Sequence, residues 1–400
     1  MFYRLPQARY RRLPSALGLV PALCGLAFLV APASAATWTI QTTPNAIGAE
    51  HSHLYDISCY STETKPCVSV GKLTQSGGKT APYAQAWNGT SWSNISASAP
   101  EGATAGELQS ADCIPFSGSL LCFAAGSYAS AGVTKSLIVL GGTGGLTSVE
   151  TTPNPEGASE TALKGMACKQ SFTTACFAVG YSVKSGKKTV FAIGRNSESK
   201  WVTQAMPEPA GATSAELHGV DCPTTTFCVA VGNYTVSGST WTMSATWNGA
   251  SWTLRTVPTP AGSTRTTLLD VSCSSASSCT GVGAYRNGVG TQLSFVQRWN
   301  GSSWSYQVSP NPAGSANTVF QGVSCISGTP CVAVGDWLDG KNWEPMAQEW
   351  NGSAWALDTT PGPSGSPETL LEGVACRVGC LSVGWYVDSF GKTKTLAESR

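Results

Sequence analysis

The sequence has few charged residues, few histidines and few methionines. Only 12% of its 400 residues are Asp, Glu, Lys or Arg, and it has 3 His and 5 Met. It lacks the clustered Lys and Arg on which nucleic-acid binding depends, so we expect no nucleic-acid partner. Beyond the first 36 residues no stretch is apolar enough to form a transmembrane helix, so we expect no stable membrane insertion of the mature chain.

Familiar catalytic motifs are missing as well. The chain has no G-x-S-x-G elbow, no zinc-protease motif and no phosphate-binding glycine loop. Glycoside hydrolysis needs two facing carboxylates, and no pair can be chosen among the 23 acidic residues. His51 and His53 have a spacing suited to a metal site on a strand, but no third ligand is evident. The sequence therefore predicts no catalytic residue, no metal and no cofactor.

The N-terminus has the pattern of a secretory signal peptide. Four arginines within the first 12 residues precede an apolar run over residues 16–30, and an A-x-A exit follows near Ala35. A retained membrane anchor is the alternative, but the run contains Pro21 and is short for a membrane span of about 20 residues. We predict a signal peptide over residues 1–35 and a secreted or cell-surface protein, expected to be a monomer.

One phrase recurs seven times in the rest of the chain. It consists of a Leu or Phe, a short apolar step, a Cys, a small loop, a second Cys and a small-Val-Gly ending, and its first cysteines are 51 to 55 residues apart. A regular period of this size indicates a solenoid, a propeller or an array. We predict an all-β fold for residues 36–400, a single domain in the form of a seven-bladed β-propeller with four-stranded antiparallel blades.

The cysteines of the repeat predict disulfides. Of 15 cysteines, 14 follow the signal peptide, two in each copy, and an even number behind an export signal is typical of disulfide bonding. Zinc is the alternative, but it needs four ligands in one place, whereas each pair here stands alone. The predicted pairs are Cys59/Cys67, Cys113/Cys122, Cys168/Cys176, Cys222/Cys228, Cys273/Cys279, Cys325/Cys331 and Cys376/Cys380.

The sixth copy shows how one blade is built. Strands are expected over residues 320–325, 331–335 and 345–350, with a fourth that begins at Trp355. Asn351-Gly352 indicates a hairpin, since both positions of a two-residue type I′ turn need positive φ. Such a turn places Trp350 and Trp355 diagonally across the hairpin, and a four-residue loop, the alternative, places them directly opposite each other.

The last copy is incomplete. It ends after its third strand at Arg400, while residues 36–44 match residues 353–361 of the sixth copy almost letter for letter. We therefore expect the N-terminal strand to complete the last blade beside residues 393–400. Such closure removes the exposed sheet edges that would otherwise promote aggregation.

The small-Val-Gly strand end, followed by a strand that closes just before a Trp-led strand, resembles the kelch-type propeller repeat. Residues 36–400 are also similar to secreted bacterial repeat proteins built on V-S-C…C-x-A-V-G and W-N-G-x-x-W. The resemblance implies a propeller and is nearly silent on activity. The Asn-Gly-x-Ser-Trp turn is similar to the aspartate box of sialidase propellers, but it lacks the Asp and is one residue shorter, which indicates shared turn chemistry.

Two sets of residues are candidates for binding. The connections between second and third strands are expected to be long, variable loops on one face, and such loops usually carry binding residues. An aromatic residue two positions after the glycine of five copies is expected there, either stacking on a sugar or peptide or packing over its own blade. These aromatic residues are Tyr128, Tyr234, Tyr285, Trp337 and Tyr386.

The second set is the fourth residue before the first Cys of each copy. It is expected to begin the innermost strand and to line the rim of a central channel, where Lys164, His218 and Glu372 would meet. Polar groups beside a wet channel are the alternative interpretation. The seven residues are Tyr55, Gln109, Lys164, His218, Leu269, Gln321 and Glu372.

Taken together, these features favour a secreted, non-catalytic binding or scaffold propeller. It would recognise a glycan or an extracellular protein through its long-loop face. One alternative is a carbohydrate-active enzyme, a glycosidase or lyase, with acidic residues at the central channel. A second is a purely structural cell-surface protein.

Overall fold

The part of the chain that the structure describes consists of 28 β-strands without a helix. This computed structural model describes residues 37–60, 66–116, 119–169, 176–327, 330–377 and 379–400. The predicted signal peptide lies outside the described residues, and Ala35–Arg400 form one compact unit. Within the described ranges no helix has the length and apolar character needed to cross a bilayer.

Strands that follow one another in the chain pair antiparallel in sets of four. Two of these sets are separate four-stranded sheets. The first contains β2 (Ala49–Cys59), β3 (Cys67–Gln75), β4 (Thr80–Trp87) and β5 (Trp92–Ile95), and the second contains β14 (Ser214–Thr224), β15 (Phe227–Val236), β16 (Ser239–Trp247) and β17 (Trp252–Arg255).

Two eight-stranded sheets each consist of two such sets. One parallel pair joins the halves in each case, Thr134 with Glu160 in the first sheet and Gln292 with Asn317 in the second. The first sheet contains β6 (Ala105–Phe116), β7 (Ser119–Ser130), β8 (Val133–Gly142), β9 (Gly145–Glu150), β10 (Glu160–Cys168), β11 (Cys176–Lys184), β12 (Lys187–Arg195) and β13 (Trp201–Thr203). The second contains β18 (Arg265–Ser275), β19 (Ser278–Arg286), β20 (Gln292–Trp299), β21 (Trp304–Gln307), β22 (Asn317–Ser324), β23 (Cys331–Leu338), β24 (Trp343–Trp350) and β25 (Trp355–Leu357).

The remaining sheet joins the two ends of the described chain. Its order is β1-β28-β27-β26, and Thr39 of β1 lies opposite Ser399 of β28. Trp38, next to β1, is only 1% exposed and belongs to an apolar cluster with Leu371 and Leu396. The predicted pairing of the N-terminal strand with residues 393–400 is confirmed. The strands are β1 (Thr39–Gln41), β26 (Thr369–Cys376), β27 (Cys380–Val387) and β28 (Thr393–Ser399).

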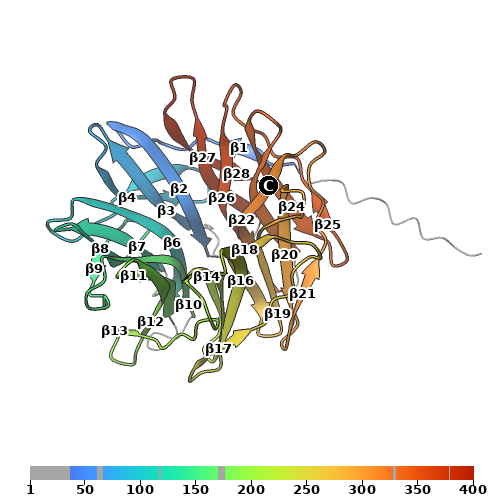
Figure 1. The fold of residues 1–400 in the computed structure, drawn as a ribbon. Coiled ribbons are helices and arrows are strands. Elements are labelled where there is room, and N and C mark those ends of the chain that lie inside the picture. The colour runs from blue at the N-terminus through green and yellow to red at the C-terminus, as the bar shows by residue number, and fades with distance from the viewer. Residues whose placement is uncertain (1–36, 61–65, 117–118, 170–175, 328–329, 378) are drawn as a thin grey trace, which may run out of the picture. The chain divides into compact units, whose positions relative to one another are not determined.

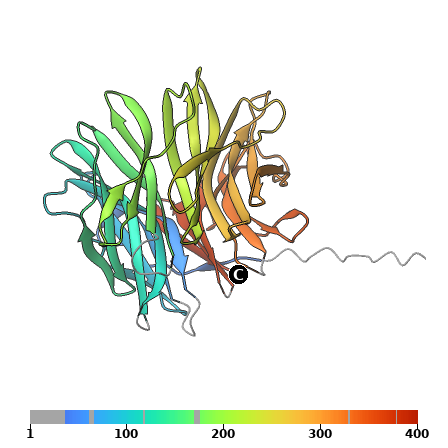
Figure 2. The ribbon, with the colours of Figure 1, turned by 90° about the horizontal axis from the view of Figure 1, so that it is seen from below.

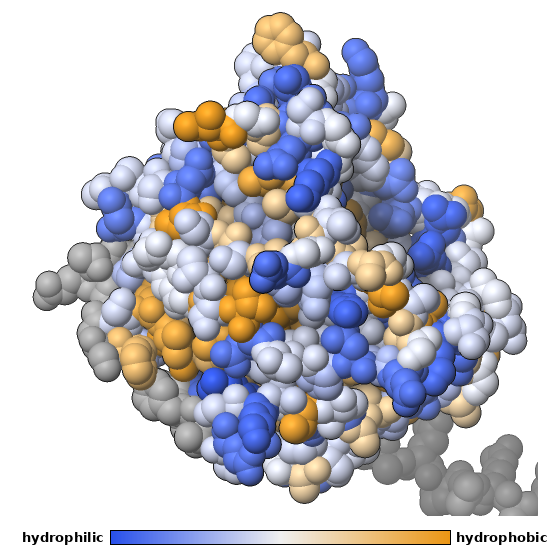
Figure 3. All heavy atoms as spheres, turned by 90° about the vertical axis from the view of Figure 1, so that its left-hand side faces the viewer, coloured by the Kyte–Doolittle hydropathy of each residue, from blue (hydrophilic) through white to orange (hydrophobic). Residues whose placement is uncertain are grey.

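The sheets follow one another around a common centre, with the first strand of each set innermost (Figures 1 and 2). Apolar side chains fill the space between successive sets. Val68 of β3, for example, clusters with Leu108 of β6 and Leu137 of β8. On the outer face seen in Figure 3, polar and apolar residues are interspersed. The core is thus a series of layers between sheets.

The structure contains all seven predicted disulfides. Each joins the end of an innermost strand to the start of the next strand, as Cys59 does with Cys67. The short loops they close give an expected stabilisation of about 2–2.5 kcal/mol each in the chain-entropy model. The pairs are Cys59–Cys67, Cys113–Cys122, Cys168–Cys176, Cys222–Cys228, Cys273–Cys279, Cys325–Cys331 and Cys376–Cys380.

The Asn-Gly hairpins adopt the four-residue loop, one of the two registers considered above. Trp350 lies directly opposite Trp355, so the loop has four residues. Asn351 Oδ1 accepts the backbone N–H groups of Ser353 and Ala354, both at 2.9 Å, and Gly352 takes a φ of 99°. The asparagine side chain therefore organises the turn, which explains why a four-residue loop replaces the two-residue one.

Tight two-residue turns join second and third strands in three of the sets, and the other four connections have only four or five residues. Ala131 and Gly132 both have positive φ, 51° and 78°, as a type I′ turn requires, and they alone separate β7 from β8. The prediction of long loops on this face is therefore wrong. The sixth copy shows the reason, because β23 and β24 continue past the buried core and leave only residues 339–342 between them. The same turn recurs at Ser185-Gly186 and Ser237-Gly238.

Candidate functional site

The innermost strands surround a cavity of about 560 Å³. The structure places the fourth residue before each first Cys in its lining. Lys164, His218 and Glu372, expected to meet at a channel, thus face one cavity, while their role in binding stays a prediction. The seven residues are Tyr55, Gln109, Lys164, His218, Leu269, Gln321 and Glu372.

A β-bulge explains why these side chains face the cavity. In β2, Leu54 pairs with Gly71 and Asp56 with Val70, so Tyr55 is the extra residue. A bulge redirects the side chain of its extra residue, so Tyr55 turns inward while Leu54 stays in the core. The expectation that these residues begin the innermost strand is wrong, since Tyr55 lies in the middle of β2. The other bulges follow Leu108, Leu163, Leu217, Leu268, Phe320 and Leu371.

The glycine of the small-Val-Gly ending makes room for this bulge. A Cβ on Gly71 would lie 1.9 Å from the carbonyl oxygen of His53. No side chain fits at that distance, so the second strand needs glycine where it passes the bulge. The repeated glycine and the inward-facing residue therefore occur together, because the glycine leaves the space that the bulge needs. The equivalent glycines are Gly126, Gly180, Gly232, Gly283, Gly335 and Gly384.

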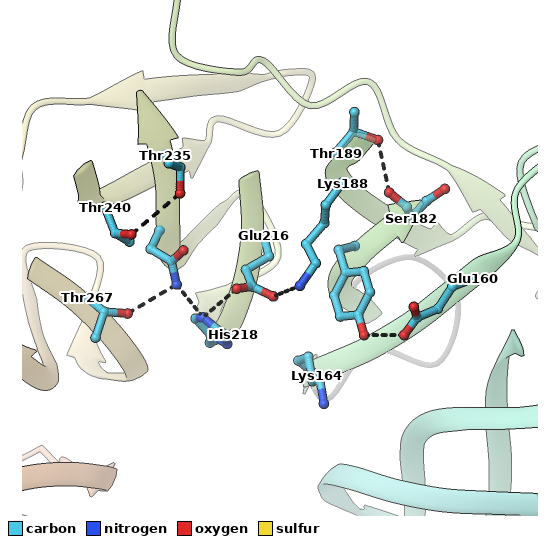
Figure 4. A network of polar contacts seen from close by, with 12 residues as sticks. Glu160, Lys164, Ser182, Lys188, Thr189, Glu216, His218, Thr235, Thr240 and Thr267 are labelled. Carbon is cyan, nitrogen blue, oxygen red and sulfur yellow. Dashed lines mark hydrogen bonds and ion pairs between the residues drawn. The ribbon is translucent and has the colours of Figure 1, made fainter. Parts of the chain in front are cut away.

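Ionisable side chains from neighbouring sets form a network beside Lys164 and His218 of the cavity lining. Glu107 lies between two lysines, 3.8 Å from Lys72 Nζ and 4.0 Å from Lys164 Nζ. Lys188 Nζ forms a shorter ion pair with Glu216, at 2.8 Å (Figure 4). These three lysines and two glutamates are half-buried, so their charges act on one another with little screening.

His218 continues this network. Its Nε2 lies 2.7 Å from the side-chain amide of Asn233, which also donates to Thr267 Oγ1 at 3.2 Å. Burial lowers the pKa of His218, against the opposing effect of Glu216. The imidazole is therefore neutral near pH 7 and available for hydrogen bonding or proton transfer. Figure 4 shows His218 and Glu216 side by side, with Lys164 across from them.

Two acidic residues lie elsewhere around the cavity, Glu372 in its lining and Asp336 next to the lining residue Gln321. Burial raises the pKa of Glu372 to about 7, while a hydrogen bond from Trp385 Nε1 at 2.9 Å opposes the shift. Burial, with a smaller contribution from the charge of Glu372, raises the pKa of Asp336 to about 8. Gln321 joins Asp336 to the lining, because its Nε2 donates to Asp336 Oδ1 at 3.1 Å. Both acids therefore hold a proton over part of the neutral pH range.

Aromatic rings stand beside these acids. His53 contacts Trp385 with ring centroids 5.2 Å apart and Tyr55 at 5.9 Å. Burial, followed by the charge of Lys72, lowers the pKa of His53 to about 4. The ring cluster of Tyr55, His53 and Trp385, of which Tyr55 lines the cavity, is therefore uncharged and aromatic near pH 7.

Other polar groups in the lining serve the fold. Asp56 Oδ2 accepts the backbone N–H of Ala111 at 2.9 Å, and Ser58 Oγ accepts that of Cys113 at 3.0 Å. Each bond joins an innermost strand to the next one. Asp112, Asp221, Asp270, Ser110, Ser272 and Ser324 make equivalent bonds to Cys168, Cys273, Val323, Met166, Cys325 and Cys376.

The five predicted aromatic binding residues are not in loops. They lie in second strands, and each packs, partly buried, against a different apolar cluster. Tyr285, for example, contacts Phe295 and Tyr306 with ring centroids 6.0 and 6.3 Å apart. The structure therefore does not bring them together, and any role in binding stays a prediction. The five are Tyr128, Tyr234, Tyr285, Trp337 and Tyr386.

The histidines of the possible metal site also separate. His51 Nδ1 lies 3.1 Å from both the backbone N–H and the hydroxyl of Thr393, whereas His53 lies against Trp385. Among the residues that the structure describes, no group of three or more His, Cys, Asp or Glu is placed to hold a metal ion.

Sequence reasoning missed much of this site. Lys72, Asp336 and Trp385 each follow the glycine of the small-Val-Gly ending, a position that was not among the candidates. Their cross-strand partners, such as His53 opposite Lys72, stand six residues before the first Cys. Reading these two positions together across the repeats would have revealed the network.

No family model and no curated protein sequence matches this chain. Among solved structures it is similar to an ulvan lyase of polysaccharide lyase family PL25, with 8% identity and a TM-score of 0.53 over 87% of this chain and 94% of that one. The same lyase bound to -[GlcA(1-4)Rha3S]- gives a TM-score of 0.52 with equal identity and coverage. The Trypanosoma rangeli sialidase in complex with sialic acid has 11% identity and a TM-score of 0.46, over 87% of this chain and 54% of that one. At such identities the likeness to the lyase concerns the fold alone, a β-propeller-like all-β architecture.

Proposed function

We propose that residues 37–400 form a closed seven-bladed β-propeller whose last blade is completed by β1. Pairing of consecutive strands in sets of four and pairing of β1 with β28 support this architecture. The innermost strands of the last and first sets also meet, because a Cβ on Gly373 of β26 would lie 2.8 Å from Cα of Asp56 in β2. Kelch-like kinship remains part of this proposal and rests on the repeat pattern alone.

We further propose that the protein acts on a polysaccharide at the central cavity. The observation that carries this is the buried acid Glu372 in a cavity lined by polar groups from every innermost strand, with a second buried acid, Asp336, hydrogen-bonded to the lining residue Gln321. Acids with strongly raised pKa values in a concave site are candidates for proton transfer. The likeness in fold to a polysaccharide lyase adds support for a glycan substrate.

The chemistry that fits is proton donation to a glycosidic oxygen. Glu372, with a pKa of about 7, is the better donor, because half of it is protonated near neutral pH and Trp385 holds one of its oxygens. The ring of Tyr55 in the cavity lining suits the apolar face of a sugar ring. In hydrolysis the glycosidic C–O bond breaks, the donated proton goes to the leaving oxygen, and water adds to the sugar carbon and gives up a proton to a base. In elimination a base takes a proton from a ring carbon, a carbon–carbon double bond forms as the C–O bond breaks, and the donated proton again goes to the leaving oxygen.

Non-catalytic glycan binding is the second candidate. The ion pairs of Glu107 with Lys72 and Lys164, and of Lys188 with Glu216, are satisfied within the protein. Because these charges already pair with one another, they favour recognition of a ligand by hydrogen bonding and stacking over charge-driven chemistry. The disulfides support an oxidising compartment for either function, so we propose that the protein is secreted.

The test is turnover of a polysaccharide panel by the purified mature chain. New reducing ends report hydrolysis, unsaturated uronates report elimination, and equilibrium binding is measured on the same panel. Glu372→Gln should abolish turnover while binding remains, and Glu368→Gln, at an exposed position of the same set, should change neither. Binding without turnover by the wild type would favour the second candidate, and absence of both would reject the cavity as a glycan site.

A further inference from the structure

Glu398 in β28 is a buried acid outside the proposed site. Glu398 has 0% exposed surface, and neither of its carboxyl oxygens has a hydrogen-bond partner among the described residues. A buried carboxylate without a partner is strongly destabilising, because it loses its hydration without compensation. Its presence at full burial therefore needs an explanation.

The repeat supplies one. Glu398 lies opposite Ser382 on the inner side and Ile40 on the outer side. The same register position in three other sets is a glutamine, opposite Ser69 and Asn94 in the case of Gln85. The other two glutamines are Gln297 and Gln348.

Each of the three glutamines donates a hydrogen bond to the carbonyl oxygen of a proline. The side-chain amide of Gln297 donates to the carbonyl oxygen of Pro258 at 2.8 Å, that of Gln348 donates to Pro310 at 2.6 Å, and Gln85 donates to Pro44. Each proline lies in the crossover that enters the set and stands six residues after the Trp of the preceding outer strand. For Glu398 the equivalent carbonyl is that of Pro361, six residues after Trp355.

A carboxylate cannot make this bond, because it only accepts hydrogen bonds, whereas a carboxylic acid has one O–H donor. We propose that Glu398 is a neutral carboxylic acid in the folded protein and donates its proton to the carbonyl oxygen of Pro361. The bond holds the crossover that contains Pro361 against the sheet of β1, β28, β27 and β26. Loss of the proton would turn it into repulsion between two oxygens.

The surroundings agree with a neutral acid. Burial raises the pKa of Glu398 to about 8 from 4.5. The charged group nearest along the same face of β28 is Arg400, which pairs with Glu349 and Asp358. Ser382 donates its hydroxyl to the carbonyl oxygen of Gly373 and is not titratable, and Leu396, two residues before Glu398 in β28, belongs to an apolar cluster with Leu371 and Val374. No counter-charge for an ionised Glu398 is found among these described neighbours.

The hydrogen bond from Glu398 to Pro361 makes the sheet that contains β28 sensitive to alkali. The pKa is raised on folding, so the stabilising proton is fully present below about pH 4.5 and is lost as the pH rises through about 8. A rise in pH through about 8 would therefore weaken the contact of β28 with the last crossover. This behaviour is independent of the proposed glycan activity.

Thermal unfolding of the wild type, Glu398→Gln and Gln348→Glu between about pH 6 and pH 9.5 tests the proposal. Glu398→Gln introduces the amide found in three other sets, so it should raise the Tm most at the alkaline end and flatten the pH dependence. Gln348→Glu adds a second acid at the equivalent position of the preceding set and should steepen the pH dependence. The infrared band of a buried protonated carboxyl should diminish in Glu398→Gln. Parallel Tm–pH curves for wild type and Glu398→Gln, with an unchanged band, would overturn the proposal, and Gln348→Glu decides the matter if Glu398→Gln fails to fold.

Discussion

The side-chain amide of Gln41 donates to Ser399 Oγ at 2.8 Å, although 358 residues separate them in the chain. This contact belongs to the antiparallel pair of β1 and β28. It places the start of the described chain in the same sheet as its end, so the last set acquires a fourth strand from the N-terminus.

The first prediction concerns Trp38, which anchors that strand. Trp38→Ala should lower the free energy of unfolding by about 3–5 kcal/mol, because the indole is almost fully buried. Trp355→Ala, at the equivalent position of the preceding set, is the matched control and should cost a similar amount. Chemical denaturation measures both, and a Trp38→Ala variant as stable as the wild type would show that β1 does not hold the last sheet.

The second prediction concerns pH and turnover. If Glu372 donates the proton, kcat should fall as the pH rises through about 7, where this acid loses its proton. Trp385→Phe keeps an aromatic ring but removes the hydrogen bond that lowers the pKa of Glu372, so the alkaline limb should move to higher pH. A purely structural role of Trp385 would lower the rate without moving the limb, and pH–rate profiles of both proteins distinguish these outcomes.

The third prediction concerns the glycine that faces the bulge. Gly335→Ala should lower stability by several kcal/mol, because the new Cβ would lie 2.1 Å from the carbonyl oxygen of Val319. Gly144→Ala is the control, since nothing lies within 4 Å of a Cβ there. Equal melting temperatures for the two variants would mean that the second strand does not need glycine opposite the bulge.

The fourth prediction concerns the aromatic residues of the second strands. Tyr285→Ala should lower the free energy of unfolding by about 2–3 kcal/mol, because the ring packs against Phe295 and Tyr306. Tyr285→Phe keeps that packing and should remain close to the wild type. Calorimetry is the measurement, and a Tyr285→Ala variant that melts with the wild type would return this residue to the list of binding candidates.

Much of the fold was predictable because the repeat carries it. The Cys pairs are close in sequence and the match of residues 36–44 to residues 353–361 is direct, so the disulfides and the pairing of β1 followed from the letters alone. The turns were less predictable. Asn351-Gly352 is typical of a two-residue turn, but its asparagine side chain caps a four-residue loop. The type I′ turns use Ala131 and Ser185, residues that are unusual at turn positions with positive φ.

The site was predictable only in part. The position of Lys164, His218 and Glu372 followed from their place in the repeat, although the bulge that turns them inward leaves no mark in a single copy. Asp336 was missed because strand β23 continues past its glycine. Glu398 was missed because its meaning appears only beside the glutamines of other sets, where the shared partner is a backbone carbonyl.

The proposed closed propeller requires that β1 and β28, from the two ends of the described chain, lie in one sheet. Thr39 Oγ1 lies 3.3 Å from Ser399 Oγ, so Thr39→Cys combined with Ser399→Cys should form a disulfide. Mass spectrometry of the oxidised double variant should find this crosslink in nearly every molecule, while Thr39→Cys combined with Ser305→Cys, on the exposed side of β21, should give none. Absence of the Thr39–Ser399 crosslink in a folded protein would contradict the closed arrangement.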